Sequence, residues 1–204
     1  DFECPMLSSP KLFGTTLDTI PSTVPYLTIP QELVEQRNPQ TTGRLKVGIV
    51  WAGQSRDDHE MKKIDDKRSI NISQFSGLLS RNADFVSLQF GDRSDEYLTL
   101  PQELHPIQIL QPDFDFLDTA AVIQNLDLVI AVDTSTAHLA AALGKPTWIL
   151  SRFDGCWRWL KYRIDSPWYP DVRIFNQPDR RGWVSPIAEL EQALEILITP
   201  RTSP

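Results

Sequence analysis

Cysteine and histidine are scarce in this sequence of 204 residues, which has two cysteines and three histidines. Cys4 and Cys156 form no Cys-x-x-Cys spacing and stand in no cluster with histidine, which argues against a structural zinc site. Two isolated thiols are typical of a reducing compartment. We therefore expect two free cysteines in a cytoplasmic protein.

Long hydrophobic runs and an excess of basic residues are also missing. No stretch approaches the roughly 18 consecutive apolar residues of a transmembrane helix. The first residues, 1–11, lack both the basic start and the apolar core of a signal peptide, and there is no initiator methionine, so we expect a piece of a longer protein or a processed chain. The net charge of −7 argues against nucleic acid as a partner, because that needs clustered Lys and Arg. A local basic pocket for a small anion remains compatible with it.

The common glycine-rich nucleotide motifs are absent as well. The sequence contains neither Gly-x-Gly-x-x-Gly nor the Gly-x-x-x-x-Gly-Lys-Ser/Thr of a P-loop. It also shows no internal repeat. The carboxylates between Asp57 and Asp66 have no regular spacing, so we expect no bound metal.

Proline, in contrast, is dense at the start of the chain. Residues 1–44 contain six prolines, which block long helices and central strands. The composition predicts a connector, or the tail of a preceding N-terminal domain, over residues 1–44. It leaves residues 45–204 as the folded domain.

From Lys46 onward, apolar strands alternate with helical patterns. Strands are expected at 46–52, 84–90, 106–110, 127–133, 146–151 and 171–177. Helices are expected at 72–81, 116–126, 134–144 and 185–198. We interpret the highly charged stretch 53–70 as a loop. This alternation predicts an α/β fold with a doubly wound, Rossmann-like parallel sheet, in which ligands bind beyond the carboxyl ends of the strands.

One strand end carries the strongest candidate site, the sequence Val-Asp-Thr-Ser-Thr-Ala-His. Here a helix begins directly after a strand, and the start of a helix binds anions through its free N–H groups and its dipole. The hydroxyls of Ser135 and Thr136 can add donors, and His138 leans back toward the same point. The alternative is that Asp133 or Thr134 merely caps the helix and that the histidine is neutral and structural.

Two further groups of residues could complete a nucleotide site. Gly53 permits close approach of a ligand to the backbone, and Lys67 or Arg68 could fold back onto a pyrophosphate; a solvated loop is the alternative. The candidates for ribose or base contacts are Gln89, Asp92 and Asp118, which could equally belong to turns and helix caps. The aromatic segment could stack on a sugar or form a small core, and its candidate residues are Trp157, Arg158, Trp159 and Trp168.

Taken together, these segments resemble the nucleotide-binding, C-terminal half of GT-B glycosyltransferases. The resemblance is to heptosyltransferase-type (family 9) enzymes, and especially to bacterial proteins that fuse such a domain to tetratricopeptide repeats. It runs from about residue 45 to 198. It depends on Asp-Thr-x-x-x-His at 133–138 together with Trp-Arg-Trp-Leu at 157–160 and Asp-Ser-Pro-Trp-Tyr-Pro at 165–170.

The resemblance implies a specific chemistry. The segment 133–138 would hold the diphosphate of a UDP-, GDP- or ADP-linked sugar, with Lys67 and Arg68 adding positive charge. Transfer would be inverting and metal-independent, without a further cofactor, onto a protein or glycan acceptor. The catalytic base would lie in an N-terminal half that this chain largely lacks. Two alternatives stay open: an inactive nucleotide-binding or protein-interaction module, and an epimerase-like domain.

Overall fold

The computed structural model describes residues 3–54, 59–161, 163–180 and 182–199. The strands are β1 (Lys46–Val50), β2 (Asp84–Ser87), β3 (Ile107–Gln108), β4 (Leu128–Val132), β5 (Thr147–Ser151) and β6 (Val172–Asn176). The α-helices are α1 (Ser9–Leu12), α2 (Gln31–Gln36), α3 (His59–Arg68), α4 (Ser76–Leu79), α5 (Phe116–Gln124), α6 (Ser135–Ala142) and α7 (Val184–Ile198). Short 3-10 helices include η3 (Ile72–Phe75), η4 (Ser94–Thr99) and η5 (Gln102–Leu104).

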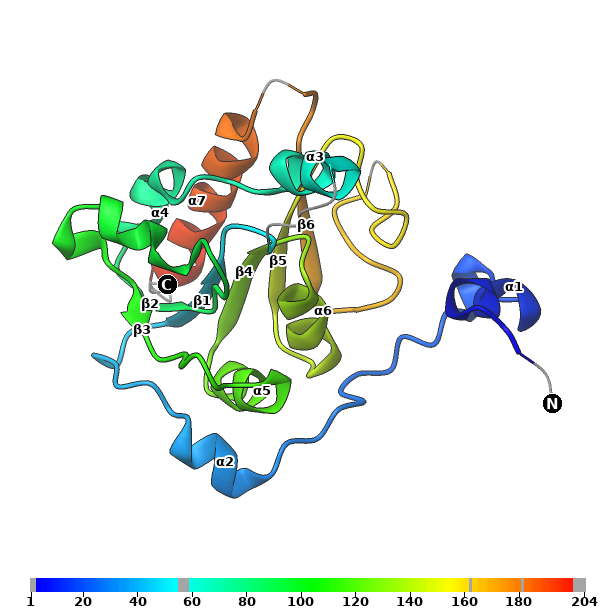
Figure 1. Ribbon diagram of the computed structural model, residues 1–204, viewed down its shortest axis with the longest axis horizontal. Coiled ribbons are helices and arrows are strands. Elements are labelled where there is room, and N and C mark those ends of the chain that lie inside the picture. The colour runs from blue at the N-terminus through cyan, green and yellow to red at the C-terminus, as the bar shows by residue number, and fades with distance from the viewer. Residues whose placement is uncertain (1–2, 55–58, 162, 181, 200–204) are drawn as a thin grey trace, which may run out of the picture.

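The six strands form one parallel sheet in the order β3-β2-β1-β4-β5-β6 (Figure 1). β1 pairs with both β2 and β4, so the strand order reverses between β1 and β4. This confirms the predicted doubly wound α/β fold. The reversal opens a crevice at the carboxyl ends of β1 and β4, where ligands bind in such sheets.

Helices cover both faces of the sheet, which explains why its central strands, β1 and β4, are almost entirely apolar. On one face, η3, α4 and α7 pack against Val47, Ile49 and the matching side chains of β4. On the other face, α5 and α6 pack against Val129 and Ala131. The alanines of α6 let that helix approach the sheet closely, which fixes the position of its first turn.

The proline-rich segment 3–44, called the connector below, contains short helices only, as the density of proline predicts. It runs along the edge of the domain and is tied to it at several points (Figure 1). Thr42 donates to Asp84 through both its N–H and its hydroxyl, Arg37 pairs with Asp118 at 2.8 Å, and Tyr26 N–H donates to the carbonyl of Ala142. The segment around α1 stands apart from the body of the domain.

The charged stretch predicted as a loop is instead partly helical, because α3 occupies His59–Arg68. Its residues include good helix formers such as Lys and Arg, and Asp65 pairs with Arg68 one turn later at 2.9 Å. The helix has almost no apolar side, and its Ile64 is exposed, so hydrophobic periodicity could not indicate it. Residues 55–58 of the predicted loop lie outside the described residues.

The thiols of Cys4 and Cys156 are both free, as expected. Over the described residues, no helix is both long enough and apolar enough to cross a membrane.

Candidate functional site

The first turn of α6 lies beside the point where the strand order reverses. Thr134 is its N-cap in an extended conformation, but its hydroxyl donates to the carbonyl of Val132 at 3.2 Å and does not cap the helix. The N–H groups of Ser135, Thr136 and Ala137 precede the first intrahelical hydrogen bond. No described residue accepts a hydrogen bond from them. The helix therefore presents an uncapped start, which is suited to binding an anion.

Asp133 supports this turn and does not cap the helix. Its Oδ1 accepts a hydrogen bond of 2.8 Å from Nε1 of Trp159, and its carbonyl accepts one of 3.1 Å from Nη1 of Arg68. The same carboxylate oxygen lies 3.9 Å from Nε2 of His138. Asp133 thus contacts side chains from α3, from α6 and from the loop after β5.

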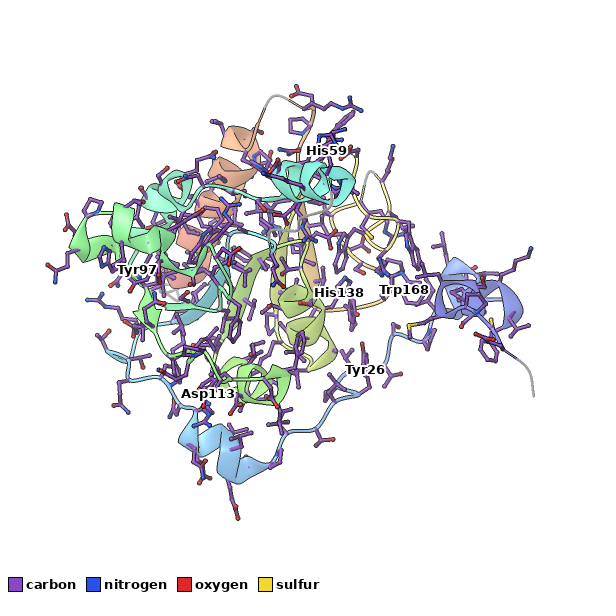
Figure 2. All side chains as sticks on the ribbon, in the orientation of Figure 1. Tyr26, His59, Tyr97, Asp113, His138 and Trp168 are labelled. Atoms are coloured by element: carbon purple, nitrogen blue, oxygen red, sulfur yellow. The ribbon has the colours of Figure 1, made fainter. Side chains whose placement is uncertain are left out.

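His138 stands where the sequence predicted it, on the first turn of α6 (Figure 2). Its ring stacks on Trp159 at 4.6 Å, and its Nδ1 lies 3.2 Å from the hydroxyl of Tyr169. Burial lowers the pKa of His138; nearby Asp133 acts in the opposite direction, and Arg158 adds to the lowering. In this state the imidazole is neutral at neutral pH, so it would contribute to anion binding as a neutral N–H donor.

Basic groups reach the same crevice from α3. Arg68 pairs with Asp65 and reaches the carbonyl of Asp133, and Gly53 packs directly against that pair. A Cβ at position 53 would collide with Asp65 Oδ1 and Arg68 Nη2. Lys67 lies farther out and pairs with Asp154 of the loop after β5 at 3.2 Å. The structure therefore brings Arg68 to the start of α6, with Lys67 on its rim.

The residues predicted for ribose or base contacts occupy three different environments. Gln89 is buried and ties the ends of β1 and β2 together: its Oε1 accepts from the N–H groups of Trp51 and Ala52, and its Nε2 donates to two carbonyls. Asp118 pairs with Arg37 and takes part in capping α5. Asp92 is exposed on the loop after β2. Of the three, Asp92 has its carboxylate directed to solvent.

The aromatic segment divides into a buried and an exposed part. Trp159 is fully buried against α6, as an aromatic mini-core requires. Trp157 is 48% exposed; its ring meets Trp168 edge to face at 6.0 Å and lies beneath the guanidinium of Arg158 at 4.9 Å. Trp157 therefore remains available for stacking, whereas Trp159 orients the histidine.

The same loop also lines a cavity of about 160 Å³ beyond the ends of β5 and β6. Leu160 turns the loop here with a φ of 59°, a left-handed conformation that is uncommon for leucine. Polar and charged side chains on its wall include Arg152, Lys161, Asn176 and Gln177. Nothing in the sequence pattern had indicated this cavity.

Sequence reasoning assigned no role to Tyr26, included Tyr169 only among the aromatic residues that could stack on a sugar or base or form a small core, and considered Asp65 only as a metal ligand. Tyr26 and Tyr169 meet although they are 143 positions apart, so no local motif could have paired them. Within residues 3–54, 59–161, 163–180 and 182–199, no three His, Cys, Asp or Glu side chains group as a metal site.

Known proteins resemble this chain in both sequence and fold. Residues 92–150 match the model of glycosyltransferase family 9 (heptosyltransferase), and this range includes the whole first turn of α6. The chain is 30% identical over 159 residues to Protein FlbA of Caulobacter vibrioides (strain ATCC 19089 / CIP 103742 / CB 15). This alignment covers 73% of this chain and 25% of FlbA.

A solved structure shares the fold. It is the crystal structure of the glycosyl transferase family 9 from Veillonella parvula DSM 2008, with a TM-score of 0.51 and 16% identity. The match covers 94% of this chain and 51% of that one. The chain thus spans about a quarter of FlbA and about half of the Veillonella protein.

Proposed function

We propose that this domain binds the diphosphate of a nucleotide sugar at the start of α6 and serves as the donor half of a glycosyltransferase. The observation that carries the proposal is the uncapped first turn of α6, with His138 beside it, inside the segment that matches the family 9 model. Arg68 and Gly53 border this turn from the β1 side.

The geometry suits stabilisation of a leaving diphosphate. When the bond between the sugar carbon and the diphosphate oxygen breaks, negative charge develops on that oxygen. The N–H groups of Ser135, Thr136 and Ala137, aligned with the helix dipole, stabilise this charge without a divalent cation. His138 adds one N–H donor, and Arg68 and Lys67 add positive charge nearby.

The other half of the reaction belongs to the acceptor. In the proposed inverting transfer, a hydroxyl of a protein or glycan attacks the sugar carbon as a carboxylate base removes the hydroxyl proton. By the resemblance, that base lies in an N-terminal half of the enzyme. The proposal includes a cytoplasmic location and no cofactor besides the UDP-, GDP- or ADP-linked donor.

The nucleoside would extend from the diphosphate toward the β2 side of the crevice. Asp92 is the candidate for the ribose hydroxyls, because its carboxylate is exposed. Gln89 and Asp118 would first have to give up their present partners. Trp157 is the candidate for stacking on the transferred sugar.

A second candidate is a binding module without transfer activity. It is favoured by the apolar side chains that the connector exposes, above all Met6, Leu12 and Phe13. Release or transfer of sugar from a nucleotide sugar by the full-length protein would rule this candidate out.

A calorimetric titration with UDP, GDP and ADP tests the proposal. We expect one of them to bind, and His138→Ala to weaken that binding by about 1–3 kcal/mol, the range for a charge-assisted hydrogen bond. His105→Ala is the matched control, because His105 contacts the carbonyl of Leu100 and meets the ring of Tyr97 edge to face, away from α6. A folded protein that binds none of the three nucleotides would contradict the proposal.

A further inference from the structure

His138 is held from behind by two hydroxyl groups that come from distant parts of the chain. The hydroxyl of Tyr169 lies 3.2 Å from Nδ1 of His138, and the hydroxyl of Tyr26 lies 3.4 Å from that of Tyr169. Tyr169 belongs to the segment before β6, whereas Tyr26 belongs to the connector. The series of contacts therefore runs from the connector to the candidate diphosphate site.

The connector is fixed at this point by its backbone. The N–H of Tyr26 donates to the carbonyl of Ala142 at 3.1 Å. A Cβ added at Gly144, just beyond the end of α6, would lie 3.5 Å from Pro25. The end of α6 thus anchors the connector, and the tyrosine next to this anchor reaches the residue that contacts His138.

The other ring nitrogen shows which way these hydrogen bonds run. Nε2 of His138 lies 3.9 Å from Oδ1 of Asp133, which is an acceptor only. A proton on Nε2 faces this carboxylate favourably, whereas a lone pair there would face its negative charge. The favoured neutral tautomer therefore carries its proton on Nε2 and accepts at Nδ1.

Tyr169 must then be the donor to Nδ1, and Tyr26 the donor to Tyr169. Burial raises the pKa of Tyr169, so its hydroxyl keeps its proton throughout the working pH range. Among the described residues, the charged groups that act on His138 are Asp133 and Arg158, and their effects on its pKa oppose each other.

We propose that Tyr169, supported by Tyr26, is a positioning residue that holds His138 as the neutral tautomer with its proton on Nε2, so that the connector forms part of the donor site. This inference rests on the proposed function, because the role given to the Nε2–H is to donate a hydrogen bond to a diphosphate. It also explains how a half-buried, neutral histidine can bind an anion, because the imidazole donates a hydrogen bond without having to gain a proton.

The nitrogen chemical shifts of the histidine rings test the tautomer without any ligand. In the 15N-labelled protein, the three histidines give three ring systems, and the one lost in His138→Gln is assigned to His138. We expect its Nδ1 in the unprotonated range and its Nε2 in the protonated range at pH 7.5. The reverse pattern, or an equal mixture, would overturn the inference.

Removing single hydroxyls tests the role of each tyrosine. Tyr169→Phe should move the His138 signals toward a mixture of tautomers and weaken nucleotide binding about 3- to 10-fold. Tyr26→Phe should cause a smaller change in the same direction. Tyr97→Phe is the matched control, because Tyr97 contacts His105, and it should change neither quantity. Unchanged His138 signals in Tyr169→Phe would overturn the inference.

The pH dependence of binding separates a neutral donor from a cation. We expect the affinity for the bound nucleoside diphosphate not to fall between pH 7 and pH 8.5. A fall approaching tenfold per pH unit would show a protonated histidine and overturn the inference. If the tautomer is as proposed and no nucleotide binds, the proposed function fails while the positioning of His138 stands. If nucleotide binds to the opposite tautomer, the proposed function stands and this inference fails.

Discussion

Two helices of this domain, α5 and α6, follow strands of the same parallel sheet and begin in opposite ways. At α5, Asp115 accepts hydrogen bonds from the N–H groups of Leu117 and Asp118, and the side chain of Asp118 accepts in return from the N–H of Asp115. At α6, the N-cap Thr134 turns its hydroxyl away to Val132, and the first turn has no side-chain cap.

The charged side chains around the two helix starts differ as well. Arg37 pairs with Asp118 at α5, and the N–H of Asp115 and this arginine lower the pKa of Asp118. The start of α5 thus carries carboxylates of its own, and one of them, Asp118, is paired with Arg37. The start of α6 is bordered by His138 and Arg68 and receives no carboxylate cap. A protein carboxylate and a ligand anion compete for the same N–H groups, so the helix whose first N–H groups have no carboxylate cap is the one open to a ligand.

The largest effect is expected when α6 is given the cap that α5 has. Thr134→Asp places a carboxylate at an N-cap whose backbone is already extended. We expect nucleotide binding to weaken by about 3 kcal/mol, because the new carboxylate occupies the N–H groups and repels the diphosphate. Calorimetric titration measures the loss.

Matched variants at the same position show how the loss arises. Thr134→Asn caps the helix without charge and should weaken binding less, and Thr134→Ser should leave it nearly unchanged. The helix itself should gain about 0.5–1 kcal/mol of stability in Thr134→Asp, as measured by urea unfolding. Full nucleotide affinity in Thr134→Asp would show that the ligand binds elsewhere.

A smaller effect is expected from Gly53, which follows β1 and lies against Asp65 and Arg68 beside the start of α6. In Gly53→Ala, the added methyl group displaces Asp65 and Arg68, so Arg68 loses its bond to the carbonyl of Asp133. We expect the free energy of unfolding to fall by about 2 kcal/mol, as is usual for overpacking, together with weaker nucleotide binding. Urea unfolding and calorimetry of the same variant measure the two. Wild-type values for both would mean that Arg68 does not contribute to this site.

The converse change removes the cap of α5. Asp115→Ala should cost about 1 kcal/mol of stability, because two N–H groups lose their acceptor. Nucleotide affinity should not change, since the proposed binding site is at the start of α6 and not at α5. A thermal unfolding curve and a titration check both statements, and a loss of affinity would contradict the assignment of the site to α6.

The smallest effect concerns pH and stability. Burial lowers the pKa of His138 in the folded protein, so the unfolded chain binds a proton first as the pH falls. The contribution of this residue to stability is therefore complete above its usual pKa of about 6.5 and is lost as the pH falls below that value. His138→Gln should reduce the difference in stability between pH 7.5 and pH 5.5. An unchanged difference would show that this histidine is not shielded from water.

The strand ends and the start of α6 could be predicted because their signals are local. Continuous apolar runs indicated the parallel strands, and Asp133 to His138 indicated a helix start directly after one of them. Helix α3 was missed because helix-forming residues and ion pairs such as Asp65–Arg68 stabilise it without an apolar face. Charged helices of this kind leave no periodic pattern in the sequence.

Contacts between distant segments could not be predicted for a different reason. The partners of Gln89 and Asp118 depend on which chain segments the fold brings beside them, namely the end of β1 and the connector. The same holds for Tyr26 and Tyr169 behind His138. A side chain capable of binding a ligand is indistinguishable in sequence from one that the fold has already paired.

The most direct test is a titration followed by 1H–15N correlation spectra, with the nucleoside diphosphate that binds. The account predicts that the amide signals of Ser135, Thr136 and Ala137 shift most, while those of Leu117 and Asp118 at the capped start of α5 stay in place. Shifts centred on α5, or on any surface away from the first turn of α6, would contradict it.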